Sequence, residues 1–249
     1  MKFVNRAAHL YAGRLGGLLL FARRFGLREF FCKPFRILFA PVIIPRLPTE
    51  SFDFQGIPLK PFYHRRNTTW ACERCVEIPI AMHFLEQYPP ARVLEVGNVL
   101  SGYFRLAHEV IDKFDHSPSV IREDVAAFST GSSYDLILSI STFEHIGFDD
   151  SHTDSAGRIQ AAIRNCRRFL RDAGQLVVTV PIGYNKHLDW LIGSGCLGCS
   201  AEVYMRRTGR FKWVASSKTD ALSSAYGRPY PYANAIGVLL FGAGRSAPA

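Results

Sequence analysis

The chain has 249 residues, of which 48% are hydrophobic and 20% are charged. This composition excludes an intrinsically disordered chain, and the length predicts one domain of about 200 residues with an appendage, or two small domains. The longest stretch without a formal charge, residues 229–244, begins with two prolines and is shorter than the roughly 20 apolar residues that a membrane span needs. The apolar run at 15–22 is followed by Arg23 and Arg24 instead of a small-residue cleavage site, so no signal peptide is expected.

The formal net charge of +9 is concentrated at the N-terminus. Residues 1–49 hold nine Lys and Arg against one acid, Glu29, whereas the remaining 200 residues carry 21 bases and 20 acids. Because the main body is nearly neutral, general nucleic-acid binding by it is not favoured, and no specific nucleic-acid partner is expected.

Residues 1–48 interleave bases with large apolar side chains. Such a basic amphipathic segment can lie on an anionic membrane surface; the alternative is a helical cap on the main domain with solvated bases. A mitochondrial transit peptide is disfavoured because no Ser precedes position 51. The prolines at 34, 41, 45 and 48 are expected to break any long helix and form a linker. We therefore predict a basic amphipathic N-terminal extension at 1–48 and an α/β domain at 49–249.

From Arg92 onwards, short apolar runs alternate with amphipathic stretches, which predicts an open α/β sheet. Strands are predicted at 92–96, 109–112, 134–141 and 175–180, with a late strand at 235–241 on an antiparallel edge. The stretch 154–170 is predicted to be a helix with Gly174 at its C-terminal cap, because its apolar residues recur at spacings of three and four. The run 175–180 is too apolar to have a wet face, as expected in a parallel sheet covered on both sides.

In such sheets the ligand site lies beyond the carboxyl ends of the strands, where the strand order reverses. That rule selects the loops after Val96, Asp112, Ser141 and Val180, and each of these loops contains polar side chains.

Three segments resemble motifs of class I S-adenosylmethionine-dependent methyltransferases. Residues 93–102 (VLEVGNVLSG) are similar to the first motif, residues 134–146 (YDLILSISTFEHI) to the fourth strand with its Glu-His pair, and residues 169–181 to the fifth strand with its preceding helix. The similarity spans about residues 93–185. The chain also resembles a subgroup of bacterial proteins associated with cell-surface polysaccharide synthesis, which carry similar VLEVGN and STFEHIG strings. The resemblance implies a Rossmann-like, mostly parallel sheet with helices on both faces.

The same resemblance implies S-adenosylmethionine as the cofactor. Asp112 is expected to accept hydrogen bonds from the ribose hydroxyls, and Asp124 is expected to read the adenine edge. The full set of residues expected at the cofactor is Glu95, Gly97, Asn98, Gly102, Asp112, Asp124 and Ser141. The glycine-rich turn departs from the family pattern because four residues separate Gly97 from Gly102, so both an altered and a lost binding mode remain open.

The implied reaction is methylation of an oxygen on a small molecule or glycan intermediate. His145 is the candidate general base, since histidine titrates near neutral pH; the alternative is that it only shapes the cofactor pocket. Glu144, Tyr184 and Asn185 are expected to contact the acceptor. The stretch 65–68 (RRNT) could bind an anionic group such as a phosphate, or simply be solvated.

Three rival interpretations stay open. The first is a catalytically inactive methyltransferase-like scaffold or binding protein in polysaccharide assembly. The second is a glycosyltransferase-like enzyme, for which Asp149-Asp150 is the nearest approach to a metal-binding Asp-x-Asp. In the third, the acids in the loops merely cap helices.

Six cysteines include two C-x-x-C pairs, Cys72/Cys75 and Cys196/Cys199. About 120 residues separate the pairs, and the first lies in a stretch predicted to be helical, so no metal site is expected. We therefore expect a cytoplasmic protein without disulfides. Its N-terminal segment is expected to allow association with a membrane.

Overall fold

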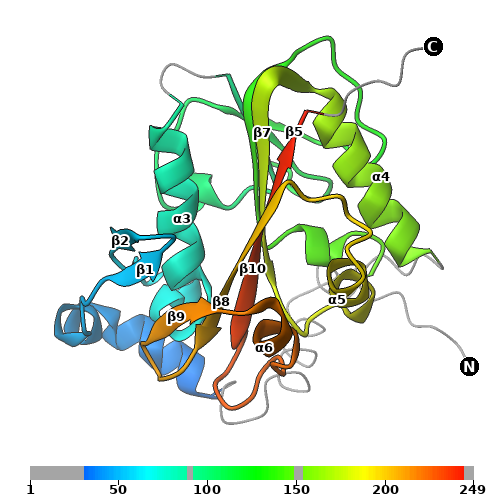
Figure 1. Ribbon diagram of the computed structural model, residues 1–249. Coiled ribbons are helices and arrows are strands. Elements are labelled where there is room, and N and C mark those ends of the chain that lie inside the picture. Colours follow the sequence, from blue (N-terminus) through cyan, green and yellow to red (C-terminus); the bar gives the residue numbers. More distant parts are fainter. Residues whose placement is uncertain (1–30, 89–91, 149–153, 244–249) are drawn as a thin grey trace, which may run out of the picture.

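The centre of the protein is one large sheet (Figure 1). The computed structural model describes residues 31–88, 92–148 and 154–243. The strand order is β5-β4-β3-β6-β7-β10-β8-β9, and a separate hairpin pairs β1 with β2. The strands are β1 (Phe52–Phe54), β2 (Ile57–Leu59), β3 (Val93–Val96), β4 (Glu109–Ile111), β5 (Val120–Ile121), β6 (Tyr134–Ile140), β7 (Leu170–Pro181), β8 (Ala201–Arg207), β9 (Trp213–Ser216) and β10 (Ala235–Gly242).

The five strands from β5 to β7 are parallel, and β10, β8 and β9 continue the sheet in antiparallel pairs. This arrangement confirms the predicted α/β class with a mostly parallel, Rossmann-like sheet. The prediction of an edge position for the late strand is wrong, because β10 pairs with β7 on one side and β8 on the other. Its residues 235–241 are all buried, and a strand so uniformly apolar is stable only inside a sheet.

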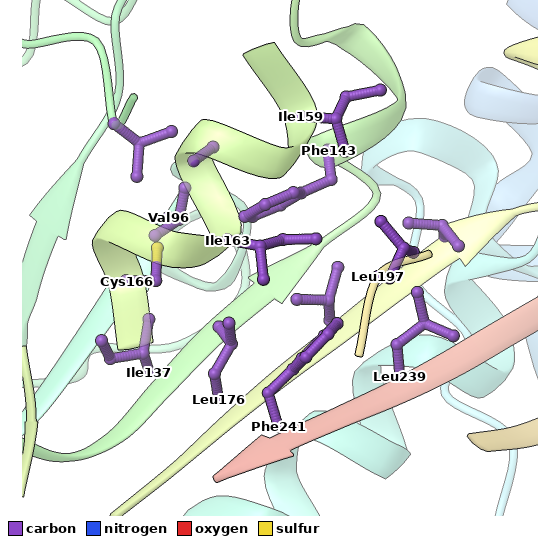
Figure 2. Packing of buried hydrophobic residues seen from close by; sticks show 14 of the residues in the cluster. Val96, Ile137, Phe143, Ile159, Ile163, Cys166, Leu176, Leu197, Leu239 and Phe241 are labelled. Atoms are coloured by element: carbon purple, nitrogen blue, oxygen red, sulfur yellow. The ribbon is translucent and has the colours of Figure 1, made fainter. Parts of the chain in front are cut away.

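Helices cover both faces of the sheet, as Figure 1 shows. The helix α3 (Arg74–Glu86) packs on one face through Val76, Ile78 and Ile80. On the other face lie α4 (Ser155–Arg168), α5 (Lys186–Gly193) and α6 (Lys218–Leu222). Figure 2 shows this second core, in which Ile159, Ile163 and Cys166 of α4 meet strand residues such as Ile137 and Leu176.

The helix α4 begins and ends for local reasons. Asp154 is its N-cap and accepts a hydrogen bond from the backbone N–H of Gly157. The helix ends at Arg168, with Phe169 as the C-cap, so the prediction that Gly174 caps it is wrong. Gly174 instead lies in β7, where the register with β6 shifts and a Cβ would come within 2.8 Å of the carbonyl oxygen of Tyr134. A glycine is required there because two backbones approach closely.

We expected the prolines to break any long helix in the N-terminal segment, but two of them do not. Residues 31–43 are helical, and Pro34 and Pro41 lie within that helix. A short 3-10 turn, Ile44–Arg46, follows. A proline inside a helix removes one N–H donor and bends the axis, but neighbouring hydrogen bonds and packing can hold the helix together. The irregular connection to β1 therefore begins only at Leu47.

Candidate active site

The loop after β3 is held in place by the buried carboxylate of Glu95. Its Oε1 accepts hydrogen bonds of 2.8 Å from the backbone N–H groups of Val99 and Leu100, and its Oε2 lies 2.8 Å from Nε2 of His108. Glu95 therefore positions the loop through its backbone. The side chain of Leu100 is fully buried in the core beside α3, so its bulk does not add to the loop surface.

Two glycines of this loop sit where a side chain would collide. Gly97 has a φ of +87°, and a Cβ on it would lie 2.1 Å from Oγ1 of Thr142, at the end of β6. A Cβ on Gly102 would lie 2.7 Å from the guanidinium of Arg66. Among the residues that the structure describes, no carboxylate pairs with that guanidinium. The loops after β3 and β6 and the 3-10 segment Arg66–Ala71 thus converge at one end of the sheet.

Asp112 follows β4 and lies beside this loop, as predicted. Its Oδ1 accepts from the backbone N–H groups of Phe114 at 2.7 Å and Asp115 at 2.9 Å, and its Oδ2 accepts from the N–H of Asn98 at 3.2 Å. The side chain of Asn98 donates to Oδ2 of Asp115 at 2.8 Å and accepts from the hydroxyl of Ser101. Since a carboxylate oxygen can accept about two hydrogen bonds, Oδ2 of Asp112 keeps one free acceptor position.

Asp124 follows β5, but its carboxylate is engaged in ion pairs. Oδ2 pairs with Arg158 of α4 and with Nζ of Lys113 at 3.1 Å, and Oδ1 accepts from the N–H of Ala126 at 3.0 Å. These partners lower the pKa of Asp124 in spite of its partial burial. The side chain is therefore committed to tying α4 to the loop after β4.

Ser141, at the end of β6, turns toward α3. It has a φ of +42°, and its hydroxyl donates to both carboxylate oxygens of Glu77, at 2.7 and 2.9 Å. Glu77 is fully buried and also receives a hydrogen bond of 2.9 Å from Thr179 and an ion pair of 3.4 Å from Arg74. Burial nevertheless raises the pKa of Glu77. Ser141 thus lies at the predicted edge, but its side chain belongs to a buried polar cluster beneath it.

The Glu144-His145 pair lies in the next turn. Glu144 is 1% exposed, and its Oε1 lies 3.6 Å from Nε2 of His145. Its Oε2 has no hydrogen-bond partner within the described part of the chain. Burial raises the pKa of Glu144 to about 8, assisted by the nearby Glu77 and opposed by His145. The His145 side chain is 41% exposed. A buried acid therefore lies directly behind an accessible imidazole.

Two predicted residues follow β7: Tyr184 faces the imidazole of His145, whereas Asn185 does not. The Tyr184 hydroxyl lies 3.1 Å from Nδ1 of His145, and its ring makes edge contacts with Phe148 and Tyr226. Asn185 is 1% exposed. Its Oδ1 caps α5, and its Nδ2 donates to the carbonyl oxygen of Glu144 at 2.9 Å. Asn185 thus positions the turn containing His145 from inside the protein.

Sequence reasoning missed the polar cluster of Arg74, Glu77 and Thr179. The available signal was an acid inside the apolar run Val76–Ala81, since an isolated carboxylate on the buried face of a helix needs polar partners. The partners themselves were not visible, because Thr179 is 102 positions away along the chain.

All six cysteines are free thiols; Cys72 and Cys75 are buried, whereas Cys196 is exposed. Across residues 31–88, 92–148 and 154–243, no group of three metal-binding side chains comes together. Asp149 and Asp150 lie outside the described residues. Within the same ranges no helix is long and apolar enough for a membrane crossing.

No protein-family model matches the chain, and no curated protein matches it. Solved structures similar to it include the N-methyltransferase NodS from Bradyrhizobium japonicum with S-adenosyl-L-homocysteine, at 15% identity and a TM-score of 0.38, covering 61% of this chain and 77% of that one. An S-adenosylmethionine-dependent methyltransferase from Clostridium acetobutylicum is similar at 11% identity and a TM-score of 0.37, covering 85% and 98%. The amino pentose methyltransferase CalS10 from Micromonospora echinaspora is similar at 19% identity and a TM-score of 0.31, covering 45% and 51%.

Proposed function

We propose that the protein is an S-adenosylmethionine-dependent methyltransferase that methylates a hydroxyl oxygen of a small molecule or glycan intermediate. The observation that carries this proposal is the row Glu144, His145 and Tyr184. This row begins two residues after Thr142, which touches the Gly97 turn. An accessible base thus follows closely in the chain after Thr142, the residue that meets the loop assigned to the cofactor by the family resemblance.

The residues around the first loop fit a nucleoside in part. Gly97 leaves the backbone open to close approach, and the free acceptor position on Oδ2 of Asp112 suits one ribose hydroxyl. Asn98 and Ser101 border the same position. Arg66, whose guanidinium pairs with no carboxylate of the described residues, brings a positive charge next to Gly102 that suits a carboxylate. Asp124 fits the adenine edge poorly, because its Oδ2 already pairs with Arg158 and Lys113 and its Oδ1 accepts from the N–H of Ala126. When bound, S-adenosylmethionine supplies an electrophilic methyl group on a sulfonium.

In the proposed reaction, His145 removes the proton of the acceptor hydroxyl. In the tautomer in which Nδ1–H donates to the Tyr184 hydroxyl, Nε2 has the lone pair that accepts the proton. The resulting imidazolium lies 3.6 Å from Oε1 of Glu144, and its positive charge favours ionisation of that buried acid, so that the two charges stabilise each other. General base catalysis of this kind contributes about 10²–10⁴-fold, and alignment of acceptor and methyl contributes the larger share.

Calorimetric titration with S-adenosylhomocysteine and with S-adenosylmethionine tests the cofactor assignment. The expected result is micromolar binding that Asp112→Ala weakens about 10- to 100-fold, the worth of a hydrogen bond to a charged group. Asp172→Ala is the matched control, because Asp172 is an exposed acid in the bulged part of β7. Absence of binding by the wild-type protein overturns the proposal.

A second candidate is a methyltransferase-like scaffold or binding protein in polysaccharide assembly that no longer turns over. The observation favouring it is that Oδ2 of Asp124 and Oδ1 of Asp112 each already have two partners, so neither oxygen has an acceptor position left for a cofactor. The same titration separates the two candidates, since the scaffold is expected to bind neither cofactor form.

A further inference from the structure

The helix at residues 31–43 presents an apolar face to solvent. Its five most exposed large side chains follow a spacing of four, three, one and three, which forms one stripe along a helix, and Ile37, which is 44% exposed, lies outside this spacing. The exposed fractions are 61% for Phe31, 62% for Phe35, 70% for Leu38, 50% for Phe39 and 53% for Val42. We call these five residues the apolar stripe. In a surface helix of a globular domain this face points to the core, so the orientation here is inverted.

The opposite side of the helix contacts the body of the protein. Ala40 is 1% exposed, and Nζ of Lys33 lies 5.9 Å from the centre of the Tyr232 ring. Tyr232 precedes β10, whose residue Ile236 pairs with Pro181 at the carboxyl end of β7. In Figure 1 the helix, drawn in blue, lies at the lower end of the sheet. The apolar stripe is therefore held outward at the end of the molecule that carries the candidate site.

The charge around the stripe has one sign. Residues 31–49 contain Lys33, Arg36 and Arg46 and no acid, and residues 1–49 contain nine bases and one acid. A second copy of the chain docking through the same face would bring these like charges together, which is unfavourable. A bilayer containing anionic lipids complements both features, because its head groups attract the bases and its acyl boundary takes up the apolar side chains.

We propose that the apolar stripe docks the protein on the surface of a membrane that contains anionic lipids. The helix would lie in the interface plane with the stripe in the acyl boundary and with the bases at the level of the head groups. This inference does not depend on the proposed methyl transfer, since it rests on the exposure of the apolar stripe and on the charge of residues 1–49.

Co-sedimentation of the full-length protein with vesicles tests the proposal. The expected result is binding to phosphatidylcholine vesicles that contain phosphatidylglycerol, and weaker binding to phosphatidylcholine alone. Phe35→Ser combined with Phe39→Ser should reduce binding at least about tenfold, because each substitution removes an apolar side chain from the bilayer. The matched control is Trp190→Ser, since Trp190 of α5 is 62% exposed but lies outside the stripe; its binding should equal that of the wild type.

Added salt and Arg46→Gln test the electrostatic part, and each should weaken binding to the anionic vesicles. Circular dichroism of each variant checks that the body stays folded. The proposal is overturned if the wild-type protein ignores anionic vesicles at low salt, or if the double Ser variant binds them as well as wild type. It is also overturned if the wild-type protein does not bind vesicles and light scattering shows that it is a dimer whereas the double Ser variant is a monomer. A second copy of the chain would then cover the stripe.

Discussion

The pH dependence of stability offers a sharp test of the buried acid behind His145. The perturbation is Glu144→Gln, which replaces a 1% exposed carboxyl with a neutral amide of the same shape. The pKa of Glu144 is raised from 4.5 to about 8 in the folded protein, mainly by burial. Because the folded state then binds more protons than the unfolded chain between these values, the free energy of unfolding falls as the pH rises through this window.

The magnitude follows from the size of the pKa shift. Each pH unit within the window lowers the free energy of unfolding by about 1.4 kcal/mol, so the loss approaches about 5 kcal/mol above pH 8. Glu144→Gln removes this loss. At about pH 5 the variant should be slightly less stable than wild type, since the amide nitrogen takes the place of an oxygen without a hydrogen-bond partner. At about pH 9 it should be more stable by several kcal/mol.

Urea unfolding at the two pH values measures the difference. Glu202→Gln is the control, because Glu202 pairs with Lys218 at 2.8 Å and its pKa is lowered from 4.5. That substitution should cost nearly the same stability at both pH values, since both lie above the ordinary pKa of a glutamate. If the difference between Glu144→Gln and wild type is the same at both pH values, Glu144 is ionised in the folded protein at both, and the reasoning is refuted. Under the proposed function, the variant should also lose activity although it gains stability at high pH.

Three further outcomes are expected. Gly97→Ala should destabilise the protein by more than Gly56→Ala, because both have positive φ but only the Cβ at Gly97 meets Thr142; equal urea midpoints would contradict this. Ile163→Ala should cost about 2–5 kcal/mol in the same assay, since Ile163 is 3% exposed in the core beside α4, and a cost below about 1 kcal/mol would refute that packing. Tyr184→Phe should shift the pH–rate profile of methyl transfer with the fold intact, because it removes the hydroxyl that pairs with Nδ1 of His145; an unchanged profile would exclude that role.

Periodicity along the chain was sufficient to predict the sheet and the helix α4. The uniformly apolar runs became central strands, and the spacing of Ile159, Ala162 and Ile163 became the buried face of α4. Both outcomes depend on local patterns of burial, which a sequence displays directly. The position of β10 was not predictable in the same way, because an apolar strand does not reveal which neighbours it pairs with.

The residues selected by the strand-end rule do lie at the carboxyl ends of the parallel strands, but the rule could not assign their hydrogen bonds. Asp112 keeps one acceptor position, whereas Asp124 is paired with Arg158, which is 34 positions away in the chain. Ser141 and Asn185 lie where they were expected, yet their side chains turn inward to Glu77 and to the turn of Glu144. Whether such a side chain meets a ligand depends on partners that only the folded chain brings together.

The chain order of apolar and polar residues thus determined which segments become strands and helices, and that acids, glycines and a histidine follow the parallel strands. Tertiary structure decided which of those groups are already satisfied, that Leu100 is buried in the core, and that the side of the helix at 31–43 facing outward is the apolar one. The physical reason is the distance along the chain between the residues involved. The periodicity of burial depends on a few neighbouring residues. The hydrogen bonds and protonation of a buried carboxyl such as that of Glu77 or Glu144 instead depend on contacts across the whole fold.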